Sequence, residues 1–381
     1  MFVFGIVMAL LGALLPLLSQ QFGFDLAQAG NLFLTMNCCM LVSMLSLGVL
    51  TDRFGQKPVL IAGALAVAGA FVLLIQSASF GAVLVSVGLL GVGGGALNGG
   101  TNTLVSDLYA DPIRKASALN LLGVFFGFGA LFLPFTIGAL LDALGLPTIL
   151  WLAVLLSVAP AALFLALTFP PPKQRQGVPI SEAARLARNP VLLLIAFLLF
   201  FESGNEFILG GYISTYLRSE SATSLSAASY VLAGYWAAIM VTRILSSRLL
   251  FRFRNTTLVL ASAACTAAAV AFLMASRSPA AGAIAVVLTG AGCASIYPTV
   301  LAQAGALFPN TSGTVFGIIF AIALAGGMTL PWAVGQIAAA NGLRWGLSLP
   351  LFNALMIFFL QTRIMRKQTE VTCLQSTTTK K

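Results

Sequence analysis

The chain contains no histidine and very little charge of either sign. Of its 381 residues, 8% are charged and 59% are hydrophobic, whereas soluble domains carry about 25% charged residues. This composition excludes a soluble enzyme or binding domain of this length and predicts an integral membrane protein. Without histidine, a proton carried inside the membrane has to be bound mainly by a carboxylate, and the chain has only ten acidic residues.

Patterns that would support catalysis are also missing. The five cysteines, Cys38, Cys39, Cys265, Cys293 and Cys373, have no disulfide or metal-binding spacing. No glycine-rich loop ends in Lys-Ser or Lys-Thr, so the sequence has no signature of an ATP site. We therefore expect no metal, no cofactor and no enzymatic activity. The net charge of +10 follows from the loops described below and does not indicate a nucleic-acid partner.

Apolar segments are numerous and long enough for twelve membrane-spanning helices. Their expected limits are 1–18, 28–50, 58–76, 81–105, 116–141, 147–169, 190–217, 226–248, 256–275, 281–303, 312–337 and 343–364. No small-residue cleavage site follows the first segment, so we do not expect a signal peptide. The sequence thus divides into an N-terminal half at 1–169, a polar linker at 170–189, a C-terminal half at 190–365 and a tail at 366–381.

The two halves repeat a pattern of proline and glycine. A shift of 197 residues superposes Pro112 on Pro309 and Pro134 on Pro331, and four glycines match in the same register. The repeat favours a duplicated six-helix unit. Transporters built from such repeats bind their substrate between the two halves, near the middle of the membrane.

Lysine and arginine are unevenly distributed between the loops. With the N-terminus in the cytoplasm, one side of the membrane carries seventeen of them, Arg243 included, and the other side carries Arg218, Arg277 and Arg344. Cytoplasmic loops are enriched in these residues. We therefore expect the linker and both termini in the cytoplasm, and a multi-pass location in the plasma (inner) membrane.

A basic turn with two glycines connects the second and third expected spans. It runs from Gly48 to Lys57 and contains an acid that can cap or pair, with two cations at the membrane surface. Its pattern, G-x-x-x-D-R-x-G-x-K, closely resembles the signature loop of the major facilitator superfamily. The resemblance implies two six-helix halves and a cytoplasmic latch formed by Asp52, with Gly48, Arg53, Gly55 and Lys57 around it. The simpler alternative is an ordinary capped turn.

Two acids lie inside the seventh expected span. Glu202 and Glu206 are four residues apart and share a helix face, with Asn205 close beside it. A carboxylate at this depth costs several kcal/mol unless it is neutralised, paired or exposed to a wet cavity, so it marks a functional site by default. We predict that Glu206 is the main coupling or ligand carboxylate and Glu202 the second. The alternative is a structural pair bonded to another helix.

The fourth span adds two amides to the candidate site. Asn98 and Asn102 share a helix face, and their amides both donate and accept hydrogen bonds, as a hydroxyl-rich ligand requires. They could instead bond neighbouring helices. This run and the segment from Asn205 to Tyr212 resemble the fucose-permease-like sugar branch of the superfamily. Drug–proton antiporters of the superfamily usually have an arginine in this helix, and this chain has none.

Further candidates are spread over other spans. We expect Tyr212, Tyr297, Trp332 and Gln336 to contribute to substrate binding, although Trp332 could equally be a core aromatic residue. Tyr297 precedes Pro298, where we expect a kink. Near the membrane surface, Asp107 and Arg114 are expected to pair or to cap the turn between the fourth and fifth spans, with a gating or structural role.

These features together predict an all-α polytopic membrane protein that is a monomeric secondary transporter. The family resemblance implies that spans 1, 4, 7 and 10 line a central cavity in the lipid bilayer. The predicted substrate is a small polyhydroxylated solute such as a sugar, symported with protons. One alternative is a proton-driven exporter of drugs or metabolites, for which the 28 phenylalanines could line an apolar pocket. The other is a membrane receptor that binds a ligand without transporting it.

Overall fold

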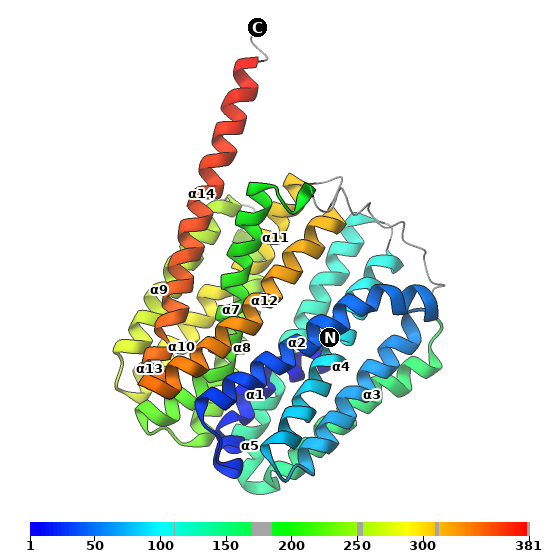
Figure 1. Cartoon of the computed structure of the whole chain (residues 1–381), viewed down its shortest axis with the longest axis vertical. Helices are drawn as coiled ribbons and strands as arrows, with labels where there is room; N and C mark the ends of the chain where they lie inside the picture. The colour runs from blue at the N-terminus through cyan, green and yellow to red at the C-terminus, as the bar shows by residue number, and fades with distance from the viewer. Residues whose placement is uncertain (110, 170–184, 250–253, 309–311, 379–381) are drawn as a thin grey trace.

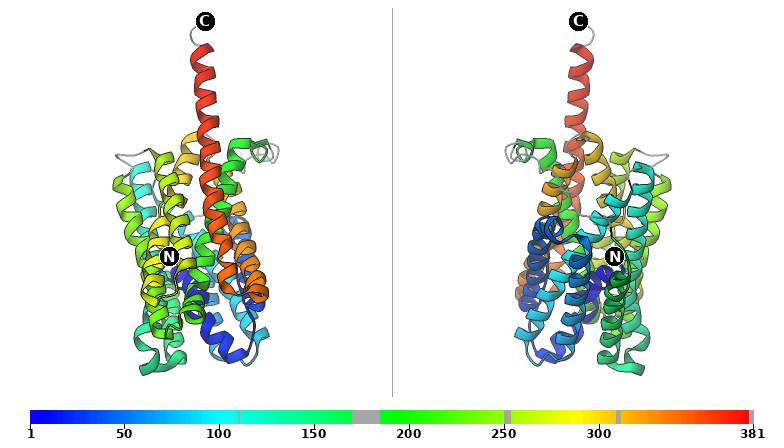
Figure 2. Two further views of the ribbon diagram at one scale, coloured as in Figure 1. Left: turned by 90° about the vertical axis from the view of Figure 1, so that its left-hand side faces the viewer. Right: turned by 90° about the vertical axis from the view of Figure 1, so that its right-hand side faces the viewer.

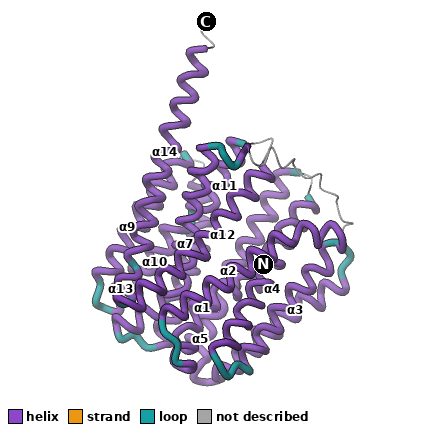
Figure 3. Tube along the Cα trace, in the orientation of Figure 1, coloured by secondary structure: helices purple, strands orange, loops and turns teal. Residues whose placement is uncertain are grey.

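The structure is a computed structural model that describes residues 1–109, 111–169, 185–249, 254–308 and 312–378. Within these ranges the regular elements are helices and no strand occurs, as Figures 1 and 3 show. The first group comprises α1 (Phe2–Phe22), α2 (Leu26–Phe54), α3 (Gln56–Ile75), α4 (Phe80–Leu108) and α5 (Pro112–Ala166). The second comprises α7 (Pro190–Ser221), α8 (Leu225–Leu249), α9 (Asn255–Ala275), α10 (Pro279–Cys293), α11 (Ile296–Leu307), α12 (Ser312–Asn341), α13 (Leu343–Gly346) and α14 (Ser348–Thr378).

Eleven segments of the described chain are long and apolar enough to cross a membrane, and one of them contains two of the expected spans. Helix α5 has 55 residues, and an α-helix of that length would measure about 80 Å, far more than the roughly 30 Å hydrocarbon core. Gly145, at φ 72° and ψ 157°, interrupts it between the fifth and sixth expected spans. Glycine adopts such a φ without steric cost. The all-helical, multi-span fold predicted from the sequence is confirmed.

The bundle has two chemically different ends. At the first, here called the basic end, α2 ends, α7 begins and α14 extends well beyond the other helices (Figure 2). The opposite end, here called the far end, contains the turn between α1 and α2. There Arg344 forms an ion pair with Glu220 over 3.2 Å. The basic end corresponds to the side that the sequence predicts to be cytoplasmic.

Helices of the two groups touch through small residues between the middle of the bundle and the far end. The backbones of α1 and α7 meet at Gly12 and Gly210, where a Cβ on Gly12 would overlap the carbonyl oxygen of Gly210. Ser214 donates a hydrogen bond to the Gly12 carbonyl. Gly30 of α2 and Gly335 of α12 also approach closely, since a Cβ on Gly335 would lie 2.9 Å from the Gly30 Cα. We interpret this arrangement as a conformation that is closed at the far end.

This contact gives a first prediction. Replacing Gly12 with Val should force α1 away from α7 and shift the protein toward conformations that are open at the far end. Spin labels at Gln21 and Asn341, both exposed at that end, should then report a longer mean distance in double electron–electron resonance. The control is Gly123→Val, since a Cβ at Gly123 meets no atom within 4 Å. An unchanged distance in Gly12→Val would refute this role for the contact.

Candidate functional site

An ion pair joins α7 to α8 inside the bundle. The Arg243 guanidinium nitrogen Nη2 lies 3.3 Å from Oε1 of Glu206. The two side chains are only partly buried, with 29% of Arg243 and 15% of Glu206 exposed. A guanidinium compensates a carboxylate at membrane depth, which otherwise is costly. The remaining exposure leaves the pair accessible to a solute or to water.

A proline on the neighbouring helix provides the second partner of Arg243. The span predicted over 281–303 is divided into two helices. Helix α10 ends at Cys293 and α11 begins at Ile296. Pro298 has no N–H, so it cannot donate the helical bond to the Ala294 carbonyl four residues earlier. Nε of Arg243 donates to that carbonyl instead, over 3.2 Å. The predicted kink is thus present, and it holds the guanidinium in place against Glu206.

The assignment of Arg243 to the cytoplasmic surface is therefore wrong. The span predicted over 226–248 contains its backbone, as α8 does, but its side chain turns inward to Glu206 and does not belong with the charges of the loops. Sixteen basic residues then remain on the predicted cytoplasmic side. An arginine inside an apolar span is itself a signal of function, so the sequence could have revealed this residue.

Glu202 has a different environment from Glu206. Only 1% of its surface is exposed, and its Oε2 has no hydrogen-bond partner among the described residues. Glu202 lies one helical turn before Glu206 on the same face of α7. The two acids therefore belong to one electrostatic cluster, but only Glu206 is accessible.

The amides predicted to bind substrate lie in two separate places. In α7, Asn205 is fully buried and its Oδ1 accepts a hydrogen bond from Nδ2 of Asn353 in α14, over 3.0 Å. This bond joins Asn205 to α14 and not to Glu206. In α4, Nδ2 of Asn102 donates to Oδ1 of Asn98 over 3.0 Å. Both α4 amides are partly exposed, so they can still reach a ligand.

Three of the other candidates lie at the contact between α7, α12 and α2. The Tyr212 hydroxyl donates to the Pro331 carbonyl over 3.1 Å, and its ring lies 4.9 Å from that of Phe33. Trp332 donates from its indole nitrogen to Oδ1 of Asn31 over 3.2 Å. Nε2 of Gln336 donates to the Ala27 carbonyl over 3.4 Å. In this conformation Trp332 and Gln336 thus hold the two groups of helices together.

Tyr297 is the aromatic candidate on the helix that follows the kink. It is partly buried at the start of α11, directly before Pro298 and three residues after Ala294, whose carbonyl accepts from Arg243. The structure therefore pairs Glu206 with Arg243, with Glu202 one turn away on α7 and Tyr297 on α11, which packs against α7.

The basic turn after α2 is described only in part. Gly48 and Asp52 lie in α2 and Asp107 lies in α4, but the surroundings of these three residues are outside the description. Gly55 has φ 79° and separates α2 from α3. The Arg53 side chain is exposed and lies over the Phe54 ring, 5.2 Å from its centroid.

Lys57 has a clear structural role in this turn. Its Nζ donates to the carbonyls of Leu165 and Leu167 over 2.8 and 2.9 Å. These carbonyls lie at the end of α5, where a cation also interacts favourably with the helix dipole. Arg114 forms an ion pair with Asp111, 3.9 Å away, and its predicted pairing with Asp107 involves a side chain outside the described part. Asp111 also accepts from the Arg114 backbone N–H, as a helix cap does.

The kink gives a second prediction. Pro298→Ala restores an N–H that competes with Arg243 for the Ala294 carbonyl. We expect the apparent affinity for the transported solute to fall by roughly five- to tenfold, or about 1 kcal/mol, in a binding titration. Pro160→Ala restores an N–H in α5 and should leave the affinity unchanged. An affinity equal to wild type in Pro298→Ala would show that this carbonyl does not position Arg243.

Comparison with known proteins gives consistent matches. The model of the Major Facilitator Superfamily matches residues 1–203. The uncharacterized MFS-type transporter YfkL of Bacillus subtilis is 25% identical over 365 residues, which covers 90% of this chain and 88% of YfkL. The fosmidomycin resistance protein of Escherichia coli is 23% identical over 94% of this chain and 90% of its own. The crystal structure of the E. coli fucose:proton symporter FucP superposes with a TM-score of 0.68 at 20% identity, over 95% of this chain and 96% of FucP.

Proposed function

Since this chain belongs to the major facilitator superfamily, we propose that it carries a small polyhydroxylated solute, such as a sugar, across the membrane together with protons. The observation that supports this proposal is the accessible ion pair between Glu206 and Arg243. In this proposal the two halves alternate between conformations open at either end, with the solute bound between them.

Coupling follows from competition for the guanidinium. When Glu206 is ionised, it occupies Arg243 and the site is electrically satisfied. When Glu206 binds a proton, its charge is lost and the Arg243 N–H groups become available to the solute. Solute and proton therefore favour each other's binding. Release of the proton restores the ion pair and displaces the solute.

The other groups of the site suit a hydroxylated ligand. Arg243 supplies donors, a protonated Glu206 both donates and accepts, and Tyr297 of α11, a helix that packs against α7, offers a hydroxyl. Asn98 and Asn102 add accessible amides from the other half. FucP is named as a fucose:proton symporter, so fucose and related sugars are the first compounds to test. The structural similarity to FucP supports the fold and not the substrate.

Proton-driven export is a second candidate, and the name of the fosmidomycin resistance protein favours it. The two are distinguished by direction. A thermal-shift screen of sugars, nucleosides and fosmidomycin first identifies a compound that stabilises the purified protein. In proteoliposomes with an acidic exterior, a symporter accumulates that compound and an exporter of the antiport type expels it.

The orientation proposed here places the basic end and both termini in the cytoplasm, in the inner membrane. A third prediction tests it with single cysteines in a cysteine-free background. Gln21→Cys at the far end and Ala187→Cys at the basic end are both exposed. In intact cells, an impermeant maleimide should label the first and not the second until the cells are permeabilised. The reverse pattern would invert the orientation.

A further inference from the structure

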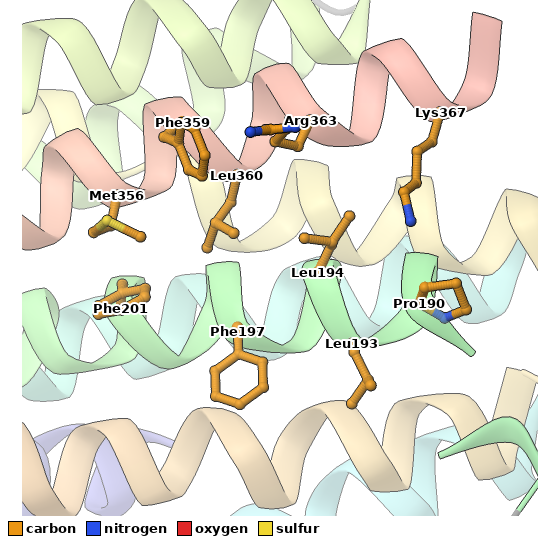
Figure 4. A pocket seen from close by; sticks show the side chains of 10 residues that line it. All are labelled: Pro190, Leu193, Leu194, Phe197, Phe201, Met356, Phe359, Leu360, Arg363 and Lys367. Atoms are coloured by element: carbon orange, nitrogen blue, oxygen red, sulfur yellow. The ribbon is translucent and has the colours of Figure 1, made fainter. Parts of the chain in front are cut away.

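A groove runs along α7 and α14 at the basic end, as Figure 4 shows. Its volume is about 580 Å³, a size that accommodates a sizeable ligand. Phe197 and Phe359 line it and are 47% and 48% exposed, respectively. Figures 1 and 2 show α14 on the outside of the bundle, where exposed apolar side chains meet the lipid. The groove therefore opens to the bilayer, away from the ion pair described above.

The length of the groove corresponds to one leaflet. On α7 it extends from Pro190 to Phe201, and on α14 from Met356 to Lys367. Each wall rises about 17 Å, and half of the hydrocarbon core measures about 15 Å. Helices α7 and α14 run in opposite directions, so Pro190 and Lys367 lie at the same end of the groove, near the membrane surface (Figure 4). This end is here called the shallow end. Phe201 and Met356 lie at the other end, deeper in the membrane.

Charge is confined to the shallow end. Arg363 and Lys367 are one helical turn apart on α14, and the rest of the lining is apolar. The Arg363 guanidinium lies 5.0 Å from the centroid of the Phe359 ring, at the edge of the groove. Among the described side chains, neither cation forms an ion pair with a carboxylate. The groove thus combines an apolar trough with two cations above it that pair with no described carboxylate.

From this combination we propose that the groove binds an anionic phospholipid, with one acyl chain in the trough and the phosphate at Arg363 and Lys367. A peptide would bury backbone polar groups against walls that offer no partners, and that is costly in a membrane. A free phosphate ion would leave the trough unused. The orientation proposed above puts the site in the cytoplasmic leaflet, where anionic lipids attract basic residues. The inference does not depend on which solute is transported.

The test compares lipids on the full-length protein in detergent. Dioleoyl phosphatidylglycerol should raise the melting temperature and be retained in native mass spectrometry, whereas dioleoyl phosphatidylcholine should do so weakly. Arg363→Gln/Lys367→Gln should reduce phosphatidylglycerol retention by about tenfold. Arg254→Gln/Arg366→Gln is the matched control, because it removes two exposed cations of the same end that do not line the groove. A second variant, Leu193→Trp, fills the trough with both cations in place and should also reduce retention.

Three results would overturn the proposal. Equal retention of the two lipids by the wild type would show that the headgroup charge is not recognised. Equal losses in the groove variant and the matched control would show a general effect of surface charge. Stabilisation by glycerol 1-phosphate as large as that by phosphatidylglycerol would show a phosphate site that makes no use of the trough.

Discussion

Replacing Glu206 with Gln should abolish proton-driven accumulation of the solute while preserving exchange. Glutamine has nearly the shape of a protonated glutamate and still donates and accepts hydrogen bonds, but it cannot release a proton. With one proton per solute, a gradient of one pH unit supports about tenfold accumulation. In proteoliposomes with this gradient, the wild type should approach that ratio and Glu206→Gln should stop near equal concentrations on the two sides.

The matched control for this variant is Glu202→Gln. It makes the same change four residues away, at a carboxylate that is almost fully buried and does not contact Arg243 in a described ion pair. We expect a smaller loss of accumulation. Full accumulation by Glu206→Gln would remove Glu206 as the proton carrier and leave uniport, or coupling through Glu202, as the better account.

Removing the guanidinium should have the second largest effect. Arg243→Gln leaves Glu206 without its charge partner and the Ala294 carbonyl without its donor. Breaking a fully buried pair costs about 3–5 kcal/mol; because this pair is partly exposed, we expect a loss of about 1–3 kcal/mol in thermal unfolding and transport below about one tenth of wild type.

A double variant separates stability from function. Glu206→Gln/Arg243→Gln contains no uncompensated charge, so it should regain most of the thermal stability but none of the coupling. Arg243→Lys keeps the charge, yet a single ammonium cannot reproduce the planar, two-sided contact with Glu206 and Ala294. We expect Arg243→Lys to keep most of the thermal stability and to transport the solute more slowly than the wild type. A double variant as unstable as Arg243→Gln would show that the loss comes from packing and not from the unpaired acid.

The fold was predictable from the sequence because hydrophobic length and charge alone define membrane spans. The break at Pro298 was also predictable, since proline removes a specific hydrogen bond. The turn within α5 lies at Gly145, between the two spans expected at 116–141 and 147–169, so the break was predictable although the residue that makes it was not. The repeat predicts that the two halves pack against each other. Which small residues make the contact, such as Gly12 and Gly210, is visible only in the structure.

The candidate site was less predictable, because a helix face does not reveal which neighbour it meets. Glu206 and Glu202 share a face, yet one is accessible and the other is buried. Asn205 differs from Glu206 by a single position and bonds α14 instead. Trp332 and Gln336 look like ligand groups in the sequence, but they bond α2 at the far end. These partners are more than a hundred residues apart in the sequence, and only the packing of the helices brings them together.

The coupling of solute to proton is tested most directly by following protons. In lightly buffered proteoliposomes without an imposed gradient, the compound identified by the thermal-shift screen is added outside and the external pH is recorded. We predict alkalinisation that accompanies solute entry in the wild type and is absent in Glu206→Gln. Solute entry into wild-type vesicles with no change in pH, or an equal pH change in Glu206→Gln, would contradict the account.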